Sequence, residues 1–350
     1  MFCATLVADN IIHVGGKIMA FAPLVKEYRG NTLDLTHFGY LTIVDENSKV
    51  LYSVGDPDDI VYYRSASKPI QALPVIARGL DKRYGLTEEE STIFAGSHAG
   101  EKFHIAALES IFKKCGMKEE TLCMKPAVPG YVPANEQRIR EGLAPRKFYH
   151  NCAGKHAALM LIQRELGGDI ADYWKMGSVG QLEVQRTIEV MSETKQVELG
   201  IDGCGVPVFA VPIRCIANAY KNLVCPEKVQ DEGLQQAVID FVPRIHKYPH
   251  MMRGTDFICN LINQDPNLVG KGGANSVYGF ALKKEKLGVS FKFIDGTEHL
   301  WPLVILEVLK GLGALSKETE ERFKIFHPYT VHNDNDTLVG TNVPCFEVKI

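Results

Sequence analysis

The sequence predicts an α+β fold in which amino- and carboxy-terminal strands complete one antiparallel sheet beside a mainly helical middle region. Short apolar runs broken by turn residues occupy residues 18–55 and return after Ala274, whereas residues 66–250 repeat apolar side chains every three or four positions. This order of strands, helices and strands also breaks the βαβ alternation of a doubly wound parallel sheet. We therefore expect a single catalytic domain over residues 1–350, with a helical subregion at about 66–250.

Each expected element follows from a local pattern. Apolar runs with hairpin breaks predict strands over 18–25, 40–44 and 50–54. Helical spacing, several times ending at glycine, predicts helices over 70–79, 103–116, 155–167, 181–194 and 234–245. The pattern then predicts strands over 276–282 and 287–294, a turn at 295–296 and a helix near 301–313.

Composition excludes several classes of partner. The 39 lysines and arginines against 42 aspartates and glutamates leave a net charge of −3, and no run of five like charges occurs. Neither nucleic acid nor a membrane surface is therefore an expected partner. The first residues lack the basic and apolar regions of a signal peptide, and the nine cysteines are scattered without a CxxC pair. We expect a cytoplasmic protein with reduced thiols.

A Ser-x-x-Lys pair at Ser65 and Lys68 is the first chemical signal. Pro69 places a helix start nearby, because proline is tolerated only in the first turn. Residues three apart share a helix face, so Ser65 rather than Ser67 is expected beside the Lys68 ammonium. A desolvated lysine with a lowered pKa can accept the proton of a serine nucleophile. The alternative is a capping serine beside a solvated lysine.

Four further segments present reactive side chains. Ser97 lies between glycines ahead of a helix, and its histidine neighbours do not have the spacing of a zinc protease. Residues 150–156 and 200–207 and the glycines around Lys271 are dense in groups that can line a site. Neither glycine-rich segment matches a phosphate-binding loop. Taken singly, each is also compatible with an ordinary tight turn.

Together these segments resemble the asparaginase II family of the thermolabile, Rhizobium-type class. The matching blocks are RSASKPIQ at 64–71, SHAGEKFH at 97–104, NCAGKHAALM at 151–160, DGCGVPVFA at 202–210, KGGA at 271–274 and DG at 295–296. The resemblance implies a fold similar to serine β-lactamases and glutaminases, a homodimer, and hydrolysis of L-asparagine to aspartate and ammonia. It also implies the pairs Ser65 with Lys68 and Ser97 with Lys271. It further implies a Zn²⁺ ion that aids substrate binding, held by Cys152, Lys155 and Cys204.

The resulting hypothesis is an amidohydrolase that works through a serine acyl-enzyme. Ser65 is expected to attack the amide carbon, and Lys68 to relay the proton to departing ammonia. Candidates for binding the charged groups of asparagine are Arg64, His156 and Asp202. The same machinery also supports a relaxed amidase, a glutaminase or a β-lactam-type acyl hydrolase.

Three departures from the family pattern favour a second alternative. The chain has Asn275-Ser276 where an acidic residue and glycine are expected, Ser178 in a segment that lacks a His-Pro pair, and Glu298 where arginine is usual. Such changes are also compatible with a catalytically weak relative that binds zinc or a metabolite.

Overall fold

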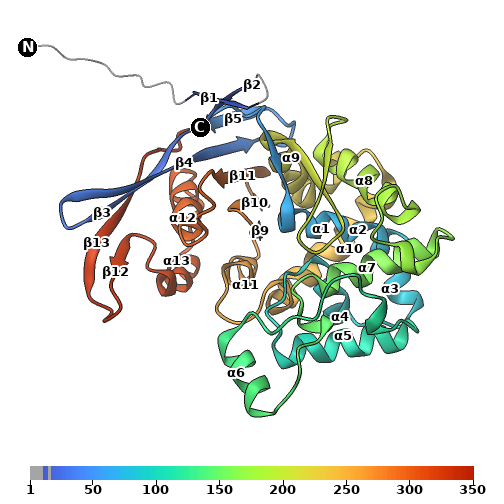
Figure 1. The fold of residues 1–350 in the computed structure, drawn as a ribbon. Helices are drawn as coiled ribbons and strands as arrows, with labels where there is room; N and C mark the ends of the chain where they lie inside the picture. The colour runs from blue at the N-terminus through green and yellow to red at the C-terminus, as the bar shows by residue number, and fades with distance from the viewer. Residues whose placement is uncertain (1–10, 15–16) are drawn as a thin grey trace, which may run out of the picture.

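The computed structural model describes residues 11–14 and 17–350 (Figure 1). The amino-terminal residues used to predict the compartment, Cys3 among them, lie outside these residues. The main sheet has the order β12-β13-β3-β4-β11-β10-β9, is antiparallel at each pairing, and carries β5 beside β4. Its strands are β3 Ala22–Arg29, β4 Thr32–Val44, β5 Val50–Val54, β9 Leu268–Gly273, β10 Val277–Leu282, β11 Leu287–Phe293, β12 Thr330–His332 and β13 Leu338–Pro344.

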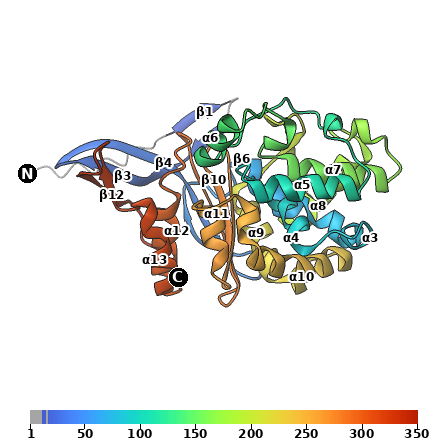
Figure 2. The same cartoon turned by 90° about the horizontal axis from the view of Figure 1, so that it is seen from below.

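This sheet confirms the predicted fold class, because strands from both ends of the chain pair within it. Figure 2 shows most helices gathered on one side of β10, and α12 and α13 on the other. The helices are α1 Lys68–Gln71, α2 Leu73–Ala77, α3 Leu80–Arg83, α4 Glu88–Thr92, α5 Lys102–Lys114, α6 Val132–Arg140, α7 Ala153–Glu165, α8 Val179–Ser192, α9 Ile213–Val224, α10 Glu232–Lys247, α11 Ile258–Leu261, α12 Trp301–Gly311 and α13 Lys317–Phe323. Within the described residues, none of the helices has the length and apolarity needed to cross a membrane.

The structure also contains strands that the sequence analysis did not predict, among them β7 Glu198–Ile201 and β8 Pro207–Pro212. A three-stranded sheet of order β6-β8-β7 interrupts the helical region, with β6 at Ile60–Tyr62. β8 is buried at each position, so it lacks the alternation that marks a half-exposed strand. A separate hairpin pairs β1 Ile11–Val14 with β2 Lys17–Ala20.

Helix α9 packs directly on the main sheet, where it contacts β4, β10 and β11. Two glycines permit this approach. A Cβ atom at Gly279 would lie 2.1 Å from the ring of Tyr220, and one at Gly288 would lie 2.1 Å from the carbonyl oxygen of Ala217. Since real Cβ atoms do not come so close to their neighbours, α9 and the sheet fit together only with glycine at both positions.

Candidate active site

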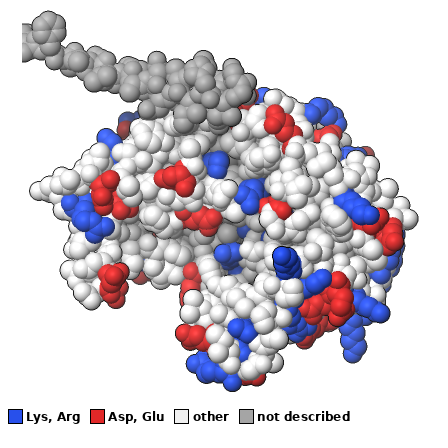
Figure 3. All heavy atoms as spheres, in the orientation of Figure 1, with Lys and Arg blue, Asp and Glu red and all other residues white. Residues whose placement is uncertain are grey.

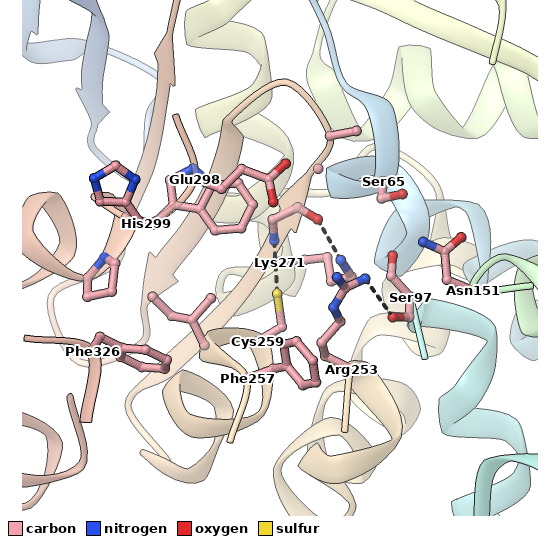
Figure 4. A pocket seen from close by; sticks show the side chains of 16 residues that line it. Ser65, Ser97, Asn151, Arg253, Phe257, Cys259, Lys271, Glu298, His299 and Phe326 are labelled. Carbon is pink, nitrogen blue, oxygen red and sulfur yellow. Dashed lines mark hydrogen bonds between the residues drawn. The ribbon is translucent and has the colours of Figure 1, made fainter. Parts of the chain in front are cut away.

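A cavity of about 470 Å³ opens between β9, the segment before α1 and the segment around α11 (Figure 4). Its lining combines nucleophilic and charged side chains with aromatic ones. The lining residues are Ser65, Ser97, Asn151, Arg253, Phe257, Ile258, Cys259, Lys271, Gly272, Gly273, Ala274, Glu298, His299, Trp301, Pro302 and Phe326. Three of the four residues that the resemblance pairs for catalysis therefore meet at one cavity, although Lys271 is more than 170 positions from the serines in the chain.

Lys68 lies directly behind this lining and is completely buried. Its ammonium donates a hydrogen bond to Ser97 Oγ at 2.8 Å and a second to the carbonyl oxygen of Asn151 at 3.3 Å. The helical spacing favours Ser65 as its partner, but the bond goes to Ser97, because the long side chain of Lys68 turns into the interior. Burial lowers the pKa of Lys68, an effect that Cys152 opposes and Lys155 reinforces.

Ser65 stands in a short 3₁₀ turn, Arg64–Ser67, that leads into α1. Arg64 has a φ of +47°, a left-handed conformation that is uncommon outside glycine and is found at functional sites. This turn positions the Ser65 hydroxyl at the cavity. Ser67 instead donates a hydrogen bond to the carbonyl oxygen of Arg64 at 2.8 Å. Its hydroxyl therefore stabilises the turn and is not part of the cavity lining.

Lys271 occupies the middle of β9, whereas its glycine neighbours predicted a loop. One of these glycines serves close packing of the sheet against α12: a Cβ at Gly272 would meet the ring of Trp301 at 2.6 Å. Burial lowers the pKa of Lys271 to about 8, and its ammonium donates to the carbonyl oxygen of Gly272 at 2.5 Å. The site thus contains two buried lysines whose affinity for a proton is reduced.

A tyrosine on α9 connects the two lysine-bearing segments. The Tyr220 hydroxyl donates to the carbonyl oxygen of Ala66 at 2.7 Å and lies 3.3 Å from that of Lys271. Ala66 adjoins Ser65, so this one buried hydroxyl holds the serine turn and β9 in fixed relation. α9 was not among the predicted helices, and Tyr220 carries no motif that could have identified it.

Arg253 and Glu298 were also missed as lining residues. Arg253 donates to the carbonyl oxygen of Ser97 at 3.0 Å and stacks on Phe257 at 5.0 Å. Burial raises the pKa of Glu298, while Arg253, Lys271 and Arg64 oppose that rise. Within the described residues, neither Arg253 nor Glu298 forms an ion pair with another side chain. One free guanidinium and one free carboxylate therefore face the same cavity.

A sequence comparison identifies the family of this chain. The model of the L-asparaginase II family matches residues 25–344. The chain belongs to the L-asparaginase II family. Membership supports amidohydrolase activity in general, whereas the thermolabile, Rhizobium-type class stays a prediction. The sequence matches no curated protein.

Solved structures similar to this asparaginase II family member include a beta-lactamase from Mycobacterium bovis. It shares 15% identity over 78% of this chain and 94% of its own, with a TM-score of 0.41. Mglu in its native form shares 11% identity over 79% of this chain, with a TM-score of 0.46. This chain spans 62% of the length of Mglu.

Of the three residues predicted to bind substrate in this asparaginase II family member, none is part of the cavity lining. Arg64 and Asp202 bind each other, with 2.8 Å between Nη2 and Oδ1. His156 is completely buried, and its Nδ1 lies 2.7 Å from the Tyr173 hydroxyl. Their role in substrate binding stays a prediction, and the geometry favours an indirect one.

The predicted zinc ligands lie together behind the cavity. Lys155 Nζ is 3.2 Å from Cys204 Sγ, and Cys152 Sγ is 3.2 Å from Asn151 Oδ1, to which it can donate a hydrogen bond. The neighbouring Cys204 thiol holds the pKa of Cys152 well below its ordinary range; burial opposes the effect, while Lys68 and Lys155 add to it. Two sulfurs and one amine within one buried cluster fit a tetrahedral zinc with a fourth position left open.

In the part of the chain that the structure describes, neither this cluster nor any other place gathers three His, Cys, Asp or Glu side chains as a metal site would. A metal ion in the Cys152 cluster would therefore need the lysine as a ligand, and that lysine would have to be neutral.

The departures from the family pattern have structural roles. Asn275 and Ser276 both adopt positive φ, at +59° and +63°, and form the tight turn between β9 and β10. Ser276 Oγ also accepts a hydrogen bond from Trp301 Nε1 at 2.8 Å, which fixes one wall of the cavity. Ser178 caps α8 by accepting a hydrogen bond from the backbone of Gln181.

Proposed function

We propose that this protein hydrolyses the side-chain amide of L-asparagine to aspartate and ammonia through a serine acyl-enzyme. The observation that carries the proposal is the 2.8 Å hydrogen bond between Lys68 Nζ and Ser97 Oγ at the edge of a cavity that also contains Ser65 and Lys271. A serine becomes a useful nucleophile only when a neighbouring base can take its proton, and a buried lysine of lowered pKa is such a base.

The chemistry divides into two proton-balanced steps. In the first, Ser65 Oγ bonds to the amide carbon while its proton passes by way of Ser97 Oγ to neutral Lys68, and Lys68 returns a proton through Ser97 to the leaving nitrogen as the C–N bond breaks. Lys271 completes the relay on the cavity side of Ser97. In the second step, water passes a proton to neutral Lys68 by way of Ser97 as its oxygen bonds to the acyl carbon, and Lys68 returns a proton by the same route to Ser65 Oγ as the ester C–O bond breaks and aspartate leaves.

Asparagine carries a positive and a negative group beside the reacting amide. The free carboxylate of Glu298 is suited to its ammonium group, and the free guanidinium of Arg253 to its carboxylate, because a bidentate carboxylate contact is the strongest pairing available to arginine. The ion pair of Arg64 and Asp202 supports the turn that holds Ser65.

Cys152, Lys155 and Cys204 would hold the Zn²⁺ ion that the family resemblance implies. A zinc ion there would supply fixed positive charge that favours binding of the substrate. The chain's own contribution is the two thiols and the amine that gather at the start of α7 and in the turn before β8. The homodimer and the cytoplasmic compartment stay predictions.

Ammonia release from asparagine by the purified full-length chain tests this proposal. We expect turnover that Ser65→Ala abolishes, together with a covalent adduct of the wild-type protein in intact-mass spectra with a slow substrate. Parallel kcat/KM values for glutamine and a chromogenic β-lactam separate an asparaginase from a relaxed amidase or a β-lactam hydrolase. Stoichiometric binding of asparagine without ammonia release would contradict the proposal and favour a binding protein.

A further inference from the structure

The cavity extends well beyond the serines and Lys271. Its volume of about 470 Å³ lies in the range of roughly 300–1,000 Å³ found for sites that take drug-sized ligands, and is generous for a single amino acid. Figure 4 shows Ser65, Ser97 and Asn151 at one end, and His299 and Phe326 at the other. The lining also contains Trp301 and Pro302, which follow His299 closely in the chain; with Phe326 they form what we call the apolar end.

The charged groups lie between these two ends. In Figure 4, Arg253 reaches toward Lys271 and Ser97, and Glu298 stands on the side of Lys271 away from the serines. From the serines outward, a substrate therefore meets a nucleophile, then a guanidinium and a carboxylate, and then an apolar surface. This order restricts the ways in which a substrate can fill the cavity.

We infer that the cavity accepts asparagine extended through its carboxyl group by an apolar residue: an asparaginyl dipeptide with a free amino group. This inference rests on the proposed asparaginase chemistry and names a larger class of substrate for the same site. The side-chain amide lies at Ser65, the ammonium at Glu298, the peptide carbonyl at Arg253, and the second side chain at the apolar end. The scissile bond is still the side-chain amide, so the products are ammonia and an aspartyl dipeptide.

Other extensions fit the observed order less well. A group on the amide nitrogen would depart from the serine end and would not reach Phe326. A group on the α-amine would remove the charge that Glu298 binds, whereas extension through the carboxyl group leaves a carbonyl oxygen that can still accept hydrogen bonds from the Arg253 guanidinium. Only extension through the carboxyl group retains the ammonium contact and also brings an apolar side chain to Trp301, Pro302 and Phe326.

Hydrolysis of four compounds tests this inference: asparagine, Asn-Ala and Asn-Phe, followed by ammonia release, and asparagine phenylated on its amide nitrogen, followed by aniline release. We expect kcat/KM for Asn-Phe to exceed that for Asn-Ala about tenfold or more, as differences in apolar pocket contacts commonly produce. Mass spectrometry should find aspartyl-phenylalanine and no free phenylalanine. Equal values for the two dipeptides, or a preference for the phenylated amide over Asn-Phe, would overturn the inference.

Variants locate the effect within the cavity. Phe326→Ala should bring the ratio of kcat/KM for Asn-Phe and Asn-Ala close to one, while Phe326→Leu, which keeps an apolar side chain, should preserve part of it. Ile325→Ala is the matched control, because Ile325 is the exposed neighbour outside the lining and should leave the ratio unchanged. An equal loss of the ratio in Ile325→Ala would contradict a specific role for the apolar end.

Binding measured separately from turnover distinguishes failure of this inference from failure of the proposed chemistry. Calorimetry with Ser65→Ala should show Asn-Phe binding about tenfold more tightly than Asn-Ala, even if no compound releases ammonia. Glu298→Gln should weaken binding of Asn-Phe severalfold and leave binding of N-acetyl-Asn-Phe unchanged. Equal affinity of Ser65→Ala for both dipeptides would overturn the inference, whereas absent turnover with selective binding would overturn only the proposed reaction.

Discussion

Lys68 and Ser97, which lie 29 positions apart in the chain, are joined by a hydrogen bond of 2.8 Å between a buried ammonium and a serine hydroxyl. The bond connects the start of α1 to the segment that precedes α5. Ser65 lines the same cavity as Ser97, so a proton can pass from Ser65 through Ser97 to the lysine. The arrangement makes these residues one unit, which leads to the first prediction.

Removal of either serine should abolish most of the activity. We expect kcat to fall to a similar residual value, roughly 10³-fold or more below wild type, in Ser65→Ala, Ser97→Ala and the double variant. Residues that act as a unit lose activity non-additively. Steady-state ammonia release measures this. Ser67→Ala is the control, since its hydroxyl bonds to Arg64 and not to the cavity. A covalent adduct that still forms in Ser65→Ala would identify Ser97 as the nucleophile.

The activity should rise with pH through about 8. Burial lowers the pKa of Lys271 to about 8, so its neutral form, which can accept a proton, becomes the major form above that pH. A profile of log kcat/KM against pH should therefore rise to a plateau, and Lys271→Arg should lose the rising limb together with most of the activity. Lys292 is a matched control, since burial also lowers its pKa to about 8 but it lies outside the cavity lining. If Lys292→Arg removes the limb and Lys271→Arg does not, Lys271 has no part in the relay.

Much of the fold could be predicted because its patterns are local. β5 begins and ends at the predicted residues. The predicted bounds of β11 and α7 agree with the observed bounds to within a few positions. β12 and β13 were missed because strands of this kind are specified by their pairing: β12 pairs with β13, and β13 pairs with β3, which lies some 300 residues earlier in the chain. Such pairing leaves no periodic signal in the sequence.

The site could be predicted only as far as its motifs extend. Ser65, Ser97 and Lys271 stand in recognisable blocks and do meet at one cavity. The partner of Lys68 could not be predicted, because helix spacing describes neighbours along one element while the Ser97 segment approaches through tertiary packing. Arg253 has no motif around it, so only the folded chain shows that it reaches the same cavity.

Zinc content should depend on the thiol cluster. We expect about one zinc per chain in protein purified without added metal, lost in Cys152→Ser and Cys204→Ser, because each change removes one of two sulfur ligands. Elemental analysis measures this, with Cys345→Ser as a control because Cys345 is exposed and outside the cluster. Chelation should raise KM more than it lowers kcat. Equal abolition of turnover would indicate a metal-activated water, and full zinc in Cys152→Ser would remove that residue from the site.

A methyl group added at Gly279, far from the reacting groups, should impair both stability and catalysis. Gly279→Ala would bring a Cβ to 2.1 Å from the Tyr220 ring, and the ring must shift because the sheet and α9 are both fully packed there. The Tyr220 hydroxyl would then lose its fixed position between the carbonyl oxygens of Ala66 and Lys271. We expect a loss of about 1–3 kcal/mol in the free energy of unfolding, typical of overpacking.

The same change should lower kcat by up to about 100-fold, because a shift of about 1 Å between reacting groups has that effect. Tyr220→Phe separates the two consequences: it keeps the ring and removes only the hydroxyl, so kcat should fall while chemical denaturation shows a smaller loss of stability than in Gly279→Ala. Gly130→Ala, where a Cβ meets nothing within 4 Å, should change neither quantity. If Tyr220→Phe retains wild-type kcat, the tyrosine packs α9 against the sheet without aligning Ser65 and Lys271.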